Sequence, residues 1–75
     1  MSNWYELEQQ LRTDRESENA KAEHICREVY RQAAEAHKNG QPFPAKEWEK
    51  VRDAREAAVE KELAYIKHLK TTPPN

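Results

Sequence analysis

Cys26 and His24 are the side chains whose chemistry could support covalent catalysis, through a thiolate nucleophile and an imidazole base. Residues two apart on a helix point about 200° apart, so His24 cannot reach Cys26 within one helix. Cys26 also falls on an apolar stripe, where a cysteine behaves as a small buried hydrophobic residue. We therefore expect no nucleophilic site, and a single cysteine excludes an internal disulfide.

The histidines and carboxylates have no metal-ligand spacing. His24 and Glu28 are four residues apart and share a helix face, but two ligands do not make a site. His37 and His68 lie elsewhere, and the sequence contains no HExxH, ExxH or CxxC pattern. Its single glycine leaves no glycine-rich loop for a phosphate. We expect no metal, no cofactor, no small-molecule substrate and no enzymatic activity.

The spacing of most charged residues predicts that they lie on solvent-exposed faces of helices. Opposite charges recur four residues apart, in the pairs Glu8–Arg12, Glu23–Arg27, Arg31–Glu35 and Arg52–Glu56. Carboxylate pairs such as Glu60 and Glu62 alternate with lysine and arginine rather than converging in a cleft. With 13 basic and 14 acidic residues the net charge is −1, which disfavours a nucleic-acid binder driven by bulk charge.

The apolar content allows only a small core. Leucine, isoleucine, valine and phenylalanine together number ten among 75 residues. Such a chain forms one domain at most, and a thin one, so we expect it to complete its core by oligomerising. No apolar run approaches the ~18 residues of a membrane span, and the acidic N-terminal segment does not resemble a signal peptide. The expected location is cytoplasmic.

A first helix is predicted over residues 4–39. Asn3 and Glu6 have the spacing of a capping box, and the stripe ends at Asn39-Gly40, which is typical of a helix C-terminus. A polar stretch interrupts the stripe, and it contains a second capping box beginning at Thr13. Two alternatives stay open, one continuous helix or a short N-terminal helix before a kink near Thr13.

A second helix is predicted over residues 44–70, after a loop at 40–43. Pro44 suits a first helical turn, and the 71–75 tail, which contains two prolines, should stop the helix and fray. The apolar stripe of this helix comprises Trp48, Val51, Ala54, Ala58, Val59, Leu63, Ile66 and Leu69. Phe43 is either a hydrophobic staple on its first turn or an exposed anchor for a partner.

So short a loop predicts an antiparallel helical hairpin within a single domain, residues 1–75. Counting outward from the loop, the end of the second helix should lie level with Asp14. Residues 4–13 would then overhang, and Trp4, Tyr5, Leu7 and Leu11 would fold back, meet a second copy or meet another protein.

The sequence therefore predicts an all-α hairpin, dimerising into a helical bundle. Its expected function is a non-enzymatic protein-interaction module, a regulator or inhibitor that binds a larger protein through Trp4, Tyr5, Leu7, Leu11 and Phe43. One alternative is a dimeric RNA- or DNA-binding regulator that uses the basic stripe Arg27, Arg31 and Lys38. A further alternative is a purely structural homo-oligomeric bundle.

Overall fold

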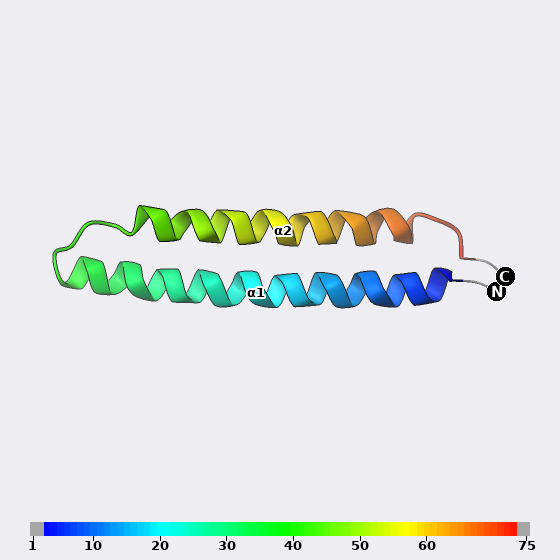
Figure 1. Ribbon diagram of the computed structural model, residues 1–75, viewed down its shortest axis with the longest axis horizontal. Coiled ribbons are helices and arrows are strands. Elements are labelled where there is room, and N and C mark those ends of the chain that lie inside the picture. Colours follow the sequence, from blue (N-terminus) through cyan, green and yellow to red (C-terminus); the bar gives the residue numbers. More distant parts are fainter. Residues whose placement is uncertain (1–2, 74–75) are drawn as a thin grey trace.

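The computed structural model, which describes residues 3–73, is an antiparallel hairpin of two helices. Helix α1 spans Trp4–Lys38 and helix α2 spans Ala45–Leu69. The two helices lie side by side along most of their length, and the first turn of α1 and the last turn of α2 lie at the same end of the rod (Figure 1). The predicted fold class is confirmed for the single chain.

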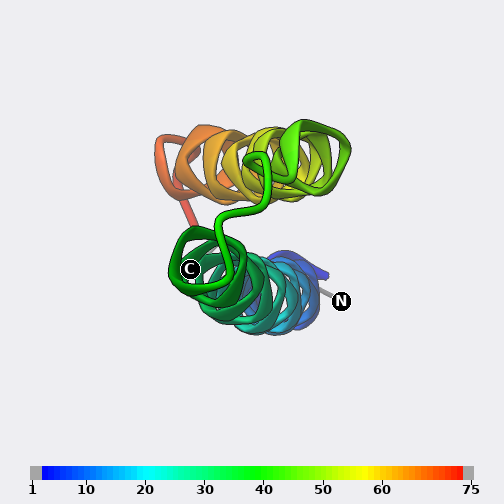
Figure 2. The same ribbon diagram turned by 90° about the vertical axis from the view of Figure 1, so that its left-hand side faces the viewer.

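The molecule is a rod with extents of 62 × 13 × 12 Å. Its radius of gyration is 17.6 Å, whereas a compact domain of this length would have about 11 Å. Viewed end-on, each helix has one neighbour and no further layer covers it (Figure 2). Each helix therefore presents most of its circumference to solvent.

Helix α1 is continuous through Thr13, so the alternative with a kink there is wrong. Asn3 occupies the N-cap position and its carbonyl accepts a hydrogen bond from Leu7 N, at 2.9 Å, but its side chain makes no capping bond. No Gly or Pro lies between residues 4 and 38, so nothing in the backbone interrupts the hydrogen-bond ladder.

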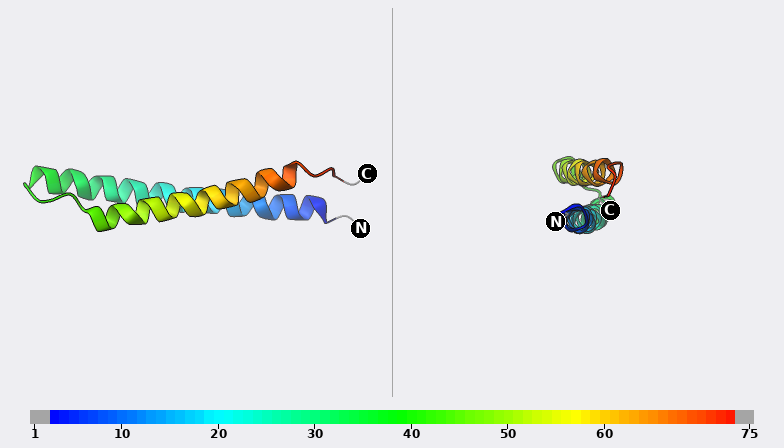
Figure 3. Two further views of the ribbon diagram at one scale, coloured as in Figure 1. Left: turned by 90° about the horizontal axis from the view of Figure 1, so that it is seen from above. Right: turned by 90° about the vertical axis from the view of Figure 1, so that its right-hand side faces the viewer.

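Gly40 ends α1 in the manner expected from the sequence. Its φ is 68°, and Gly40 N and Gln41 N donate to the carbonyls of His37 and Ala36, at 3.2 and 2.7 Å. These two bonds form a Schellman motif, which requires a left-handed residue at the position of Gly40. The chain then runs back beside the last turns of α1 before α2 begins (Figures 1 and 3).

The start of α2 is fixed by a hydrophobic staple. Pro44 occupies the N-cap position, and Phe43 packs against Trp48 in the first turn, with ring centroids 5.8 Å apart. The staple expected from the sequence is confirmed, although Phe43 itself remains exposed. The observed helix bounds differ from the predicted ones by one residue at three of the four ends.

The expected N-terminal overhang is wrong. His68 Nε2 lies 2.9 Å from the carbonyl oxygen of Trp4, and Trp4 Nε1 donates to Thr71 Oγ1 at 2.6 Å. The rings of Trp4 and His68 stack with centroids 4.5 Å apart. An extended residue advances about twice as far as a helical one. The loop therefore runs back along α1 before α2 begins, and α2 ends level with Trp4 instead of Asp14.

The hydrophobic seam between the helices is narrow. Its buried apolar residues are Ala22, Val29 and Ala36 on α1 and Val51, Ala58 and Tyr65 on α2. Each set recurs every seven residues, the repeat that keeps two helices in contact along a left-handed supercoil. Three of the six are alanines, and only Val51 has an exposed fraction below 2%. The pairing of α1 with α2 therefore buries little apolar volume.

Candidate docking surface

Helix α2 carries two apolar rows, and only one of them faces α1. The second row, here called the outer row, consists of Val59, Leu63, Ile66 and Leu69. Their exposed fractions are 54%, 58%, 38% and 47%. At 100° per residue, Val59 lies about 80° around the helix from the buried Val51. The sequence pattern predicted a single broad stripe that contained both rows, because both fit a period of 3.6 residues.

A groove adjoins the outer row at its N-terminal side. It has a volume of about 540 Å³, and its lining includes Trp48, Val51 and Val59 together with Arg52, Arg55 and Glu56. The floor is therefore apolar and the rim is charged. An apolar floor with a charged rim is similar in layout to the core and rim of protein interfaces.

An aromatic cluster adjoins the groove through Trp48, which is part of its lining. Trp48 contacts Phe43 on one side and Tyr30 of α1 on another, the latter edge-to-face with centroids 5.4 Å apart. Phe43 and Tyr30 are both more than half exposed. The three rings extend the apolar surface of the groove toward the loop end of the rod.

Cys26 lies on the same side of the hairpin. Arg55 Nη2 approaches Cys26 Sγ at 3.4 Å, and the thiol is half-buried. His24 instead lines a depression on the opposite flank, with Glu28, Gln32 and Lys50. The two side chains that could have formed a nucleophile and base are thus on different sides of α1.

A polar cluster interrupts the seam near the N-terminal end of α1. Tyr65 donates its hydroxyl to Glu8 Oε1 at 2.7 Å, and the Arg15 guanidinium lies over the Tyr65 ring, 4.7 Å from its centroid. Arg15 Nε lies 3.7 Å from Glu62 Oε2, an ion-pair distance without a hydrogen bond. The pKa of Tyr65 is raised, mainly because its hydroxyl donates to the Glu8 carboxylate and to a smaller extent because the hydroxyl is desolvated.

The five residues predicted to bind a partner are dispersed. Trp4 packs against α2, Leu11 is half-buried, and Tyr5, Leu7 and Phe43 are exposed. Tyr5 contacts Trp4 edge-to-face, with ring centroids 5.1 Å apart, whereas Phe43 belongs to the loop between the helices, at the other end of the rod (Figure 1). They do not form one continuous surface. The larger outer row was missed as a separate feature.

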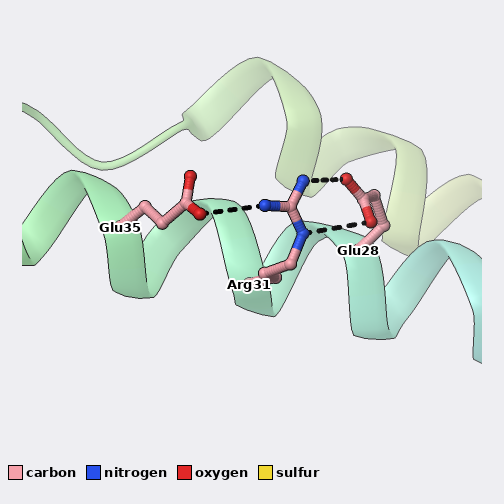
Figure 4. A network of polar contacts seen from close by, with 3 residues as sticks. All are labelled: Glu28, Arg31 and Glu35. Carbon is pink, nitrogen blue, oxygen red and sulfur yellow. Dashed lines mark hydrogen bonds and ion pairs between the residues drawn. The ribbon is translucent and has the colours of Figure 1, made fainter.

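The predicted basic stripe is largely neutralised within α1. Arg27 pairs with Glu23, and Arg31 lies between Glu28 and Glu35, with its Nη1 2.9 Å from Glu35 Oε1 (Figure 4). The hydrogen bond from Arg31 lowers the pKa of Glu28, and the same contact raises the pKa of Arg31. Lys38, the third member, is exposed at the end of α1.

Within residues 3–73, no three His, Cys, Asp or Glu side chains come together as a metal site would require. In the same part of the chain, neither helix combines the length and apolar character needed to cross a membrane. The chain matches no protein-family model, no curated protein and no solved structure. Functional inference therefore depends on the surface chemistry of the hairpin.

Proposed function

We propose that the protein is a non-enzymatic interaction module that docks through the outer row of α2. The observation that supports this proposal most directly is the row itself: four large aliphatic side chains, each 38–58% exposed, on one helix of a 75-residue chain. Single exposed apolar residues are ordinary on proteins, but a contiguous set rimmed by charge is typical of an interaction site.

The class of function is the one expected from the sequence, but the surface that would dock is the outer row of α2. Residues Val59, Leu63 and Ile66 follow the i, i+4, i+7 spacing by which one helix seats in the groove of another. The charged rim formed by Arg52, Arg55 and Glu56 would then favour some partners over others. Docked in this way, the hairpin would still be able to act as a regulator or inhibitor of a larger protein through its exposed Tyr5 and Leu7.

The nucleic-acid alternative has less support. Phosphate binding depends on cations that are free to replace counterions, whereas Arg27 and Arg31 each contact a carboxylate of α1. A fluorescently labelled single-stranded RNA and a labelled DNA duplex would serve as probes. Polarisation should remain unchanged at about 0.15 M salt, where a genuine phosphate contact would still bind.

Photo-crosslinking tests the docking surface itself. A photoreactive phenylalanine analogue replaces Leu63 in one variant and Arg27 in a matched control, and each purified protein is irradiated alone and in cell lysate. We expect protein adducts from position 63 and few from position 27, because only the first lies in the outer row. Equal yields from both positions, or none above background, would contradict the proposal.

A further inference from the structure

We propose that the outer row of α2 is occupied by a second copy of this chain, with the two α2 helices antiparallel and a two-fold axis passing near residue 57. This inference depends on the proposed docking function and specifies its partner. Three properties of the described residues support it: the accessible surface of the lone hairpin, the placement of the outer row around α2, and the order of charges along α2.

The accessible surface is larger than a stable monomer of this size presents. The hairpin exposes 6056 Å². A compact 8.9 kDa protein would expose about 4,800 Å², so the excess is about 1,250 Å². A standard protein interface buries about 800 Å² on each partner. Burial of one side of the rod against a second copy would therefore bring the exposed surface close to that of a compact domain.

The position of the outer row fits a four-helix bundle. A helix in such a bundle contacts two neighbours on faces roughly a quarter turn apart, with near-antiparallel packing. On α2 the buried row faces α1, and Val59 lies about 80° around the helix from Val51. The second contact face of α2 is thus present in the monomer and lacks only the neighbouring helix.

The heptad pattern of this face selects one register. Positions 48, 55, 62 and 69 alternate with positions 52, 59 and 66 along the face, and Leu63 lies at the flank of this face. In an antiparallel pair, a residue of the first set packs against a residue of the second set on the other helix. An axis near residue 57 places Trp48 against Ile66 of the second copy and Arg55 against Val59 of the second copy.

The same register pairs opposite charges. Arg52 of one copy lies against Glu62 of the other, and the symmetry forms this pair twice. Both side chains are accessible, at 67% for Arg52 and 42% for Glu62. A shift of one helix by a heptad in one direction would place Arg52 against Arg55 of the second copy, which pairs like charges. A shift in the other direction would place Leu69 against Arg52 and Glu62 against Val59, which pairs apolar with charged side chains. The central register alone combines apolar contacts with complementary charge.

Engineered disulfides test the register. Arg52→Cys and Glu62→Cys are introduced together with Cys26→Ser, and the protein is oxidised at low concentration. We expect a discrete covalent dimer on non-reducing electrophoresis, because two symmetric disulfides close between the same two chains. A matched pair, Arg52→Cys with Leu69→Cys, reports the shifted register and should remain largely monomeric. Preferential cross-linking of the shifted pair would overturn the proposed register.

A charge exchange provides a second measurement that needs no cross-link. Arg52→Glu should raise the dimer dissociation constant at least about tenfold, because two attractive contacts become repulsive. Because Glu62 also lies beside Arg15, Glu62→Arg is measured alone as well, and its combination with Arg52→Glu should dimerise more tightly than either single variant. Arg27→Glu on α1 should leave the dissociation constant unchanged. Circular dichroism on each variant confirms that the helices persist. Equal dissociation constants for the wild type and Arg52→Glu would overturn the charge pairing.

Failure of this inference can be told apart from failure of the docking function. If a photoreactive residue at position 63 forms adducts only with other proteins and the wild type remains a monomer, the surface docks but the second copy is not its partner. That result overturns the present inference alone. Absence of any adduct would overturn both.

Discussion

At the scale of single residues, the polar cluster around Tyr65 sets which parts of the two helices meet. Tyr65 reaches Glu8 across the seam, and Arg15 lies between the Tyr65 ring and Glu62. Polar groups inside a helical interface reduce stability but penalise misaligned pairings, where they would lose their partners. We infer that the cluster specifies how α1 and α2 are aligned. Alanines alone would allow several alignments of similar stability.

Replacing Tyr65 with phenylalanine should lower the melting temperature at neutral pH by a few degrees, because the hydrogen bond to Glu8 is lost. The raised pKa of Tyr65 means that the folded state holds the phenolic proton more tightly than the unfolded state. Its stabilising contribution is therefore complete below pH 10, the ordinary tyrosine value, and disappears as the pH rises through the raised pKa. Thermal unfolding across this range should show the wild type and Tyr65→Phe converging.

Tyr30→Phe is the control for this measurement, because Tyr30 is exposed and contacts α2 through its ring, which lies against Trp48. Its difference from the wild type should be small and should not follow the same pH profile. A Tyr65→Phe variant that unfolds at the wild-type temperature at pH 7 would contradict the role given to the cluster.

At the scale of the elements, local signals predicted most of the fold. The Gly40 stop, the Phe43–Trp48 staple and the two helix lengths all follow from contacts within a few residues along the chain. The alignment of the helices was not predictable in this way. It depends on the extended path of the loop, which short-range patterns do not encode, and on cross-helix contacts such as Trp4 with His68.

The division of α2 into two rows was also beyond the sequence pattern. Val51 and Val59 both belong to one broad apolar stripe, and only the position of α1 decides that Val51 is buried and Val59 is exposed. Tyr65 and His68, which the pattern treated as outside the stripe, are buried because α1 approaches from their side. The outer row is therefore distinguished from the buried row by the position of α1 and not by the sequence pattern.

Two matched valine substitutions test this division. In a Leu63→Asp background, which prevents association through the outer row, Val51→Ala should lower the free energy of unfolding by about 2 kcal/mol, because it removes buried methyl groups and leaves a cavity. Val59→Ala should change it by less than about 0.5 kcal/mol, as expected for an exposed site. Chemical denaturation followed by circular dichroism measures both, and equal losses would show that the two rows are not distinct.

At the scale of the whole molecule, the lone hairpin buries little apolar surface for its length, and its shape would fit one half of a four-helix bundle. Two helices that share a narrow, alanine-rich seam bury little apolar volume, while one full side of α2 stays exposed. Helices of this length gain most of their stability from packing of an apolar face. Association through the outer row would supply that packing, and it would leave the N-terminal Tyr5 and Leu7 available for another protein.

The measurement that tests this account most directly is the molar mass by light scattering after size exclusion, across a concentration series, for the wild type, Leu63→Asp and Leu7→Asp. Both leucines are about half exposed, so neither substitution should unfold the hairpin. We predict a dimer for the wild type and Leu7→Asp and a monomer for Leu63→Asp. A wild type that stays monomeric throughout, or a dimer that survives Leu63→Asp and dissociates with Leu7→Asp, would contradict the assignment of the α2 outer row as the self-docking surface.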